Sequence, residues 1–149
     1  MQPQAREPAM AATDTHIVSA RPKMTAEIMA KTGLDEEILS GLVRRFYGRV
    51  RADAVLGPIF ADRISDWDPH LERMVAFWSS VALLTGRYRG APVPAHAELP
   101  IQWDHFERWL ALFRETAVEV CPPQGAAHVI ERAERIAGAL HRAVEDAKS

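Results

Sequence analysis

One histidine of the chain stands inside a frame of prolines. Pro92 and Pro94 precede His96, and Pro100 follows it. Each proline fixes its own φ, removes a backbone donor and pushes the preceding residue out of α geometry, so no long helix crosses this stretch. Imidazole is the commonest metal ligand among side chains. The frame therefore predicts that His96 is held stiffly so that it points at a partner, and a metal ion is one such partner.

His105 competes with His96 for the same role. It lies four residues before Trp109, so the two share one helix face, but it needs no special framing. His16, His128 and His141 show no ligand spacing with one another, and we assign them no function. The sequence holds no CxxC, HExxH, EF-hand loop, P-loop or GxSxG motif, which removes the usual signals for zinc, calcium, phosphate and serine-hydrolase sites.

Three further polar side chains lie on or beside apolar helix faces. His70 begins a face that continues through Met74, Phe77 and Trp78 at spacings of three and four. Tyr47 lies beside an apolar stripe, and Trp109 belongs with Phe106, Leu110 and Phe113. Each has a plain structural alternative: a half-exposed histidine at a helix end, a tyrosine with its hydroxyl in water, or a tryptophan that only packs.

Helices must position these side chains. Amphipathic spacing predicts helices within 34–50, starting at an Asp35 N-cap, and within 65–86, 103–120 and 126–146. We expect Gly86 to cap the second of these helices, and Gly57-Pro58 to end any helix at the corner before Phe60. Pro69 leaves two starts open for the helix of His70: an N-cap at Asp68, or an earlier start at Ser65.

The fold class predicted from this pattern is all-α. Residues 1–23 have no period and are interpreted as a flexible N-terminal tail, and residues 24–149 as one domain. The net charge of -2 predicts neither a nucleic-acid nor a membrane partner, so a cytoplasmic protein is expected. Cys121, the single cysteine, excludes an intramolecular disulfide, and we expect it to pack rather than to react.

Four segments resemble the truncated haemoglobins, and most closely their group III. They are "RRFYGRV", "LGPIFADRI", "HLERMVAFWSSVALLTGRYRGAPVPAHAELP" and "HFERWLALFRE", in the family's order and at about its spacings, between Leu34 and Val144. The resemblance implies a truncated globin fold, in which two helices cross over two others as a two-over-two sandwich around haem b and its iron.

The resemblance also implies a role for each matching residue. His96 matches the proximal histidine that binds haem iron, and Phe60 the phenylalanine on the haem face. Arg73 matches a basic position that meets a haem propionate. The distal side, where a gas ligand binds, is matched by Tyr47, His70 and Trp109, with Met74 at the next inward position. Such a haem also needs apolar walls, for which Phe77, Trp78 and Leu99 are the candidates.

The function expected from this resemblance is binding of oxygen and other small diatomic ligands at haem iron. The polarity of the side chains on the distal side influences whether such a protein retains oxygen tightly or performs redox, peroxidase-like or nitric oxide-detoxifying chemistry. That chemistry would need an electron donor, which is unknown. Two alternatives stay open: a haem-based gas sensor, and a haem-free helical interaction module.

Overall fold

The computed structural model describes residues 19–90 and 101–148, and all regular structure within these ranges is helical. The helices are α1 (Pro22–Thr32), α2 (Glu36–Ala52), α3 (Leu56–Arg63), α4 (Trp67–Leu83), α6 (Trp103–Val120) and α7 (Pro123–Lys148). The all-α prediction is therefore confirmed. Residues 103–120 form the predicted helix residue for residue, and the break at Cys121 and Pro122 is where the helices α6 and α7 meet.

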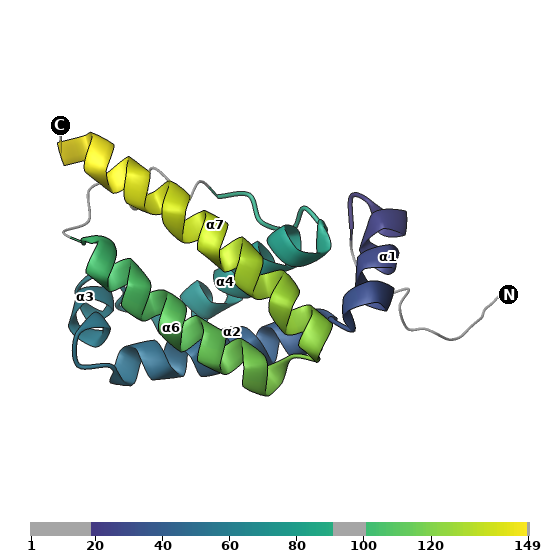
Figure 1. The fold of residues 1–149 in the computed structure, drawn as a ribbon, viewed down its shortest axis with the longest axis horizontal. Coiled ribbons are helices and arrows are strands. Elements are labelled where there is room, and N and C mark those ends of the chain that lie inside the picture. Colours follow the sequence, from purple (N-terminus) through teal and green to yellow (C-terminus); the bar gives the residue numbers. More distant parts are fainter. Residues whose placement is uncertain (1–18, 91–100, 149) are drawn as a thin grey trace, which may run out of the picture.

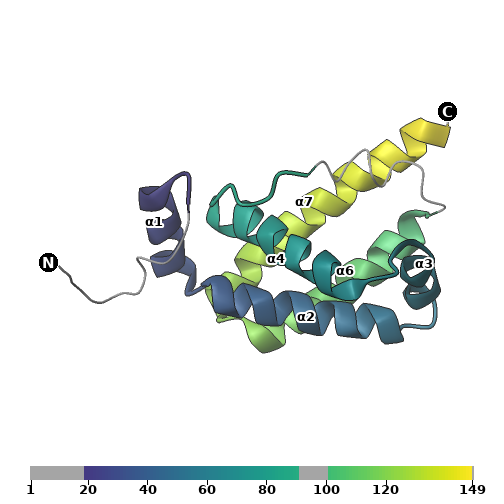
Figure 2. The ribbon, with the colours of Figure 1, turned by 180° about the vertical axis from the view of Figure 1, so that it is seen from behind.

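The long helices form two layers. Helices α6 and α7 run side by side across one face, and α2 and α4 lie behind them (Figure 1). The reverse view places α2 and α4 in front, with α1 at one end of the molecule and α3 at the other (Figure 2). The predicted arrangement of two helices over two is thus confirmed, and α3 lies where it can close one end of the space between the layers.

Apolar stripes on the facing surfaces of these helices make the core. Its largest fully buried side chains include Phe46 of α2, Trp78 of α4, Phe113 of α6 and Val129 of α7. Asp35 is the N-cap of α2, as predicted: its Oδ1 accepts a hydrogen bond from the backbone N–H of Ile38 at 2.7 Å. The predicted stripe is buried along the whole of α2, which places Tyr47 at the inner surface.

The corner after α2 differs from the expectation. Gly57-Pro58 does not end a helix; both residues lie in the first turn of α3, which begins at Leu56. Proline is harmless there because the first-turn N–H groups have no intrahelical partner. A Cβ at position 57 would lie 2.6 Å from the carbonyl oxygen of Arg51, so the glycine is needed for close approach of α3 to the end of α2.

Both ends of α4 also differ from the expectation. The helix begins at Trp67 with Asp66 as its N-cap, so neither predicted start is right. Pro69 is the third helical residue, where its missing N–H costs no intrahelical bond, and His70 follows as the fourth. At the other end the left-handed cap is Leu84, with φ 58°, and not Gly86, which follows two residues later with φ 75°.

Helix α1 begins one residue before the predicted end of the tail. Ala20 donates its backbone N–H to the carbonyl of Thr85 at 2.9 Å, and the Thr25 hydroxyl donates to the carbonyl of Leu83 at 2.7 Å. These contacts hold the start of α1 against the end of α4. The division into a flexible tail at 1–23 and a globin domain from residue 24 stays a prediction.

Asp53 joins three elements at the corner between α2 and α3. Its Oδ2 accepts hydrogen bonds from the backbone N–H groups of Val55 at 3.1 Å and Leu56 at 2.9 Å. The Arg108 guanidinium of α6 donates to the same oxygen at 2.7 Å. The hydrogen bond from Arg108, followed by those from the backbone, lowers the pKa of the Asp53 carboxyl to about 2. Asp53 therefore holds α3 against α2 and α6 in its ionised form.

We expect Asp53→Asn to lower the melting temperature at pH 7, because an amide loses the charge-assisted bonds while keeping the side-chain shape. A carboxyl with a lowered folded-state pKa stabilises above its ordinary value near 4 and loses that contribution as the pH falls toward about 2. The difference in melting temperature between Asp53→Asn and the unaltered chain should therefore shrink between about pH 5 and pH 2. Far-ultraviolet circular dichroism measures it, and a difference that is constant with pH contradicts the assignment.

Candidate functional site

A cavity of about 360 Å³ lies between the two helical layers, next to α3. This volume and its mostly apolar lining are typical of sites for small molecules and cofactors. Every element except α1 contributes a wall. The lining residues are Tyr47, Leu56, Ile59, Phe60, Arg63, Ile64, His70, Arg73, Met74, Phe77, Trp78, Tyr88, Ile101, His105, Phe106, Trp109, Ile136, Ala137 and Leu140.

Most of the site residues predicted from the sequence meet at this cavity. Those that line it are Tyr47, Phe60, Arg73, Phe77, Trp78, His70, Met74 and Trp109. His96 and Leu99 lie outside the described residues, so their roles stay predictions. The fold thus brings together side chains from α2, α3, α4 and α6 that are up to about 60 positions apart in the sequence.

Tyr47 brings a neutral hydroxyl to the cavity. The residue is 6% exposed, and its ring packs edge-on against Phe46 and Phe60 with centroid distances of 4.9 and 6.0 Å. Burial raises the pKa of Tyr47 far above its ordinary value of 10.0, so the phenol stays protonated at neutral pH. Within the described residues nothing hydrogen-bonds this hydroxyl. A hydroxyl of a cavity-lining residue that no protein group occupies is available to a ligand that can accept its hydrogen bond.

His70 lies beside Tyr47 rather than at a loose helix end. Its ring is edge-on to the Tyr47 ring at 5.5 Å and to the Trp67 ring at 5.4 Å. Its Nε2 atom is buried. The sequence left open whether His70 is only a half-exposed histidine at a helix end; in the structure it is the fourth residue of α4, with aromatic rings on two sides.

Trp109 is oriented from two sides. It stacks on Phe113 of its own helix, with centroids 5.7 Å apart and planes at 14°, and meets Phe46 of α2 edge-on at 5.2 Å. These contacts leave little rotational freedom to the indole. A tryptophan that packs and one that donates to a ligand are therefore not alternatives here, because packing fixes where the N–H of Trp109 points.

His105 has a structural task besides lining the cavity. Its Nδ1 accepts a hydrogen bond from the backbone N–H of Gln102 at 2.9 Å, which caps the start of α6. Because Nδ1 accepts, a neutral His105 ring carries its proton on Nε2, which leaves no free lone pair there for a metal. This weakens His105 as a competitor of His96.

Sequence reasoning missed several residues of the site. Arg63, Tyr88, Ile101 and Ile136 line the cavity, and Trp67 contacts its wall residues. Trp67 precedes His70 by three positions, so helical spacing was a usable signal for it. Tyr88 lies beyond the end of α4 and carried no periodic signal at all.

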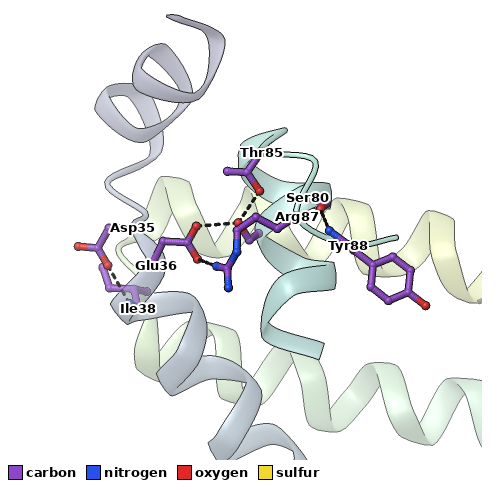
Figure 3. A network of polar contacts seen from close by, with 8 residues as sticks. Asp35, Glu36, Ile38, Ser80, Thr85, Arg87 and Tyr88 are labelled. Carbon is purple, nitrogen blue, oxygen red and sulfur yellow. Dashed lines mark hydrogen bonds and ion pairs between the residues drawn. The ribbon is translucent and has the colours of Figure 1, made fainter. Parts of the chain in front are cut away.

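A polar network fixes the segment on which Tyr88 lies (Figure 3). The Glu36 carboxylate, in the first turn of α2, accepts from the Ser79 hydroxyl at 2.7 Å and from the Arg87 guanidinium at 2.6 Å. The buried Ser79 and Thr85 hydroxyls are 2.6 Å apart, and the backbone N–H of Tyr88 donates to Ser80 Oγ at 2.7 Å. Tyr88 consequently meets Phe77 edge-on, at 5.2 Å, across the cavity wall.

Other kinds of site have no support in the described ranges. No group of three or more histidine, cysteine, aspartate or glutamate side chains is placed there to hold a metal ion. None of the described helices is both long and apolar enough to cross a membrane.

Cys121 lies at the end of α6 and does not line the cavity. Burial raises the pKa of its thiol to about 11, so almost none is thiolate at pH 7. We expect iodoacetamide to label Cys121 at least about tenfold more slowly in the native chain than in urea, because the thiolate is the nucleophile. Mass spectrometry follows the label, and equal rates in both states would show a reactive thiol.

Comparisons with known proteins agree on one family. The bacterial-like globin family matches residues 27–142. The group 3 truncated hemoglobin ctb of Campylobacter jejuni is 34% identical over 109 residues, which cover 70% of this chain and 86% of that protein. The crystal structure of group III truncated hemoglobin from Campylobacter jejuni matches with a TM-score of 0.70 and 32% identity, over 74% of this chain and 91% of that one. The two-over-two fold, the cavity between its layers and these matches show together that the chain belongs to the bacterial-like globins, as a truncated haemoglobin.

Proposed function

We propose that the cavity holds haem b and that the chain binds oxygen and other small diatomic ligands at the haem iron. The observation that carries this proposal is the Tyr47 hydroxyl. The residue is buried and lines an apolar cavity, desolvation keeps its phenol protonated, and no hydrogen bond from the described residues occupies the hydroxyl. Family membership supplies the expectation of haem.

The residues present fit a haem. The walls contributed by Phe60, Met74 and Phe77 suit a flat apolar macrocycle, whose burial supplies most of its binding free energy. Arg63 and Arg73 are exposed side chains that also line the cavity, so each can reach an opening while staying in water. Guanidinium groups at such a rim suit the two carboxylates that haem carries, and we propose both arginines for this role.

We propose His96 as the iron ligand, on the basis of its proline frame together with its match to the proximal histidine of the family. Bound haem iron supplies reversible binding of a diatomic molecule at its free coordination position. The task of the protein is then to present hydrogen-bond donors to that molecule. Tyr47 and Trp109 are the donors whose rings are most firmly oriented by packing, and His70 lies beside Tyr47.

These donors favour retention of a polar, partly negative ligand such as oxygen. Turnover in peroxidase-like or nitric oxide-detoxifying chemistry also requires an electron donor from outside the chain. Among the described residues nothing selects that chemistry over ligand binding, so we place ligand binding first. An absorption spectrum of the purified chain tests the haem-free alternative directly, because an interaction module without haem has no intense band near ~400 nm.

We expect His96→Ala to lose stable haem binding or the five-coordinate ferrous spectrum, whereas His105→Ala keeps both. The physical reason is that His105 already uses Nδ1 to cap α6, while the prolines around His96 orient it for a ligand. Each variant is reconstituted with haem and its ferrous spectrum is recorded. If His105→Ala loses the iron ligand and His96→Ala keeps it, then His105 and not His96 is the iron ligand.

We expect Tyr47→Phe and Trp109→Phe each to speed oxygen release by about twofold to tenfold, the equivalent of one net hydrogen bond. The two effects should not add, because donors that share one acceptor are coupled. His70→Leu should change ligand entry more than release. Stopped-flow oxygen dissociation and flash-photolysis rebinding measure these rates. If His70→Leu accelerates release more than either other variant, the histidine is the main donor.

A further inference from the structure

Trp67 contacts three wall residues of the cavity. Its ring lies 5.4 Å from the His70 ring at 88°, 6.0 Å from the Tyr47 ring at 51° and 6.5 Å from the Phe60 ring at 26°. These three residues come from α4, α2 and α3, and all of them line the cavity. Trp67 itself does not line it. The indole of Trp67 therefore packs behind three residues that line the cavity, without lining it itself.

Arg51 covers the Trp67 ring. Its guanidinium carbon lies 4.5 Å from the centroid of that ring, within the range of a cation–π interaction. Arg51 is exposed and belongs to the last turn of α2, where a cation also interacts favourably with the helix dipole. Its carbonyl oxygen is the atom that Gly57 approaches, so the backbone of Arg51 is fixed by the α2–α3 corner. The guanidinium of Arg51 therefore extends over the Trp67 ring from a fixed backbone position.

We infer that Trp67, held by Arg51, is a positioning residue that sets the orientation of Tyr47 and His70 and thereby how long the bound diatomic ligand is retained. This inference rests on the proposed function. Tyr47 has no hydrogen bond from the described residues to fix its ring, and aromatic contacts do this instead. Removing the indole takes away one contact from Tyr47 and one from His70, so both rings gain freedom to turn.

The test compares two tryptophans that are each the first residue of a helix. Trp67 is the first residue of α4 and Trp103 is the first residue of α6; Trp103 contacts Phe106 and His141 and does not line the cavity. Trp67→Leu and Trp103→Leu are loaded with haem, and the infrared C–O stretch of the ferrous carbon monoxide complex is recorded. That frequency responds to nearby hydrogen-bond donors. The complex is diamagnetic, so ring-proton shifts of His70 can be followed in it by NMR.

In Trp67→Leu we expect the C–O band to broaden or move to higher frequency and the His70 ring shifts to change. Oxygen release should become about threefold faster, in keeping with the modest strength of an aromatic pair. Trp103→Leu should leave all three unchanged. Trp67→Phe keeps an aromatic face and should restore most of the C–O band, a rescue that a merely structural loss of stability would not produce.

The cation is tested separately on α2. Arg51→Gln should reproduce part of the Trp67→Leu effect, Arg51→Lys should restore the native band because it keeps a cation, and Arg45→Gln serves as control, since Arg45 only approaches Glu119 at 4.0 Å. If Trp67→Leu does not fold, Arg51→Gln decides, because its C–O band moves only if the cation acts through the Trp67 ring.

Two failures are distinguishable. Native C–O bands, His70 shifts and release rates in Trp67→Leu and Arg51→Gln, with the haem band intact, would overturn the role of Trp67 alone. Absence of a haem band from the unaltered chain would overturn the proposed function, and the inference would fall with it.

Discussion

Phe113 lies between two tryptophans, and this stack sets the distance between the helical layers. Its ring stacks on Trp78 of α4 at 4.9 Å and 21°, and on Trp109 of its own helix at 5.7 Å and 14°. Phe46 of α2 closes the cluster edge-on at 5.2 Å. Rings of this size cannot be compressed, so α2, α4 and α6 are held apart by a rigid spacer. The cavity lies where that spacer ends, and Trp78 and Trp109 belong to both.

The polar groups of the site depend on the same spacer. Trp109 is oriented by the stack itself, and Tyr47 follows Phe46 on α2, so the position of the Phe46 ring fixes the turn of the helix that carries both. A hydrogen-bond donor that packing already orients loses little conformational entropy when a ligand accepts from it. Its hydrogen bond also remains available, because packing and not a protein acceptor sets its orientation. This is how an apolar core can bring the polar side chains of Tyr47 and Trp109 to the wall of one cavity.

The ends of the helices are fixed by charge and hydroxyl groups instead. The Glu36 carboxylate, paired with Arg87 and with the buried Ser79 hydroxyl, ties the start of α2 to the end of α4. Asp53 does the same for the corner of α2, α3 and α6. Both carboxylates lie beside backbone N–H groups at a helix start, where negative charge is favoured. Glu36 and Asp53 lie at opposite ends of α2, where they tie this helix to α4 and to α3 and α6.

The sequence by itself determined the four long helices and the faces they bury, whereas α3 was expected to be a corner. The Asp35 cap of α2 and the bounds of α6 could be predicted because caps, proline breaks and a spacing of three to four residues act within a few neighbours along the chain. The resemblance placed one set of residues at a single site, and all of them line the cavity: Tyr47, Phe60, His70, Met74, Phe77, Trp78, Arg73 and Trp109.

What only the tertiary structure decided is how these side chains are held. Gly57-Pro58 lies in the first turn of α3, with a glycine where the Arg51 carbonyl comes close, and Leu84 takes a left-handed cap where glycine was expected. Trp67 meets Tyr47, Phe60 and His70 because three helices converge on it. The Trp67 contacts join residues that are far apart in the chain. They depend on how the helices cross, which a local sequence pattern does not predict.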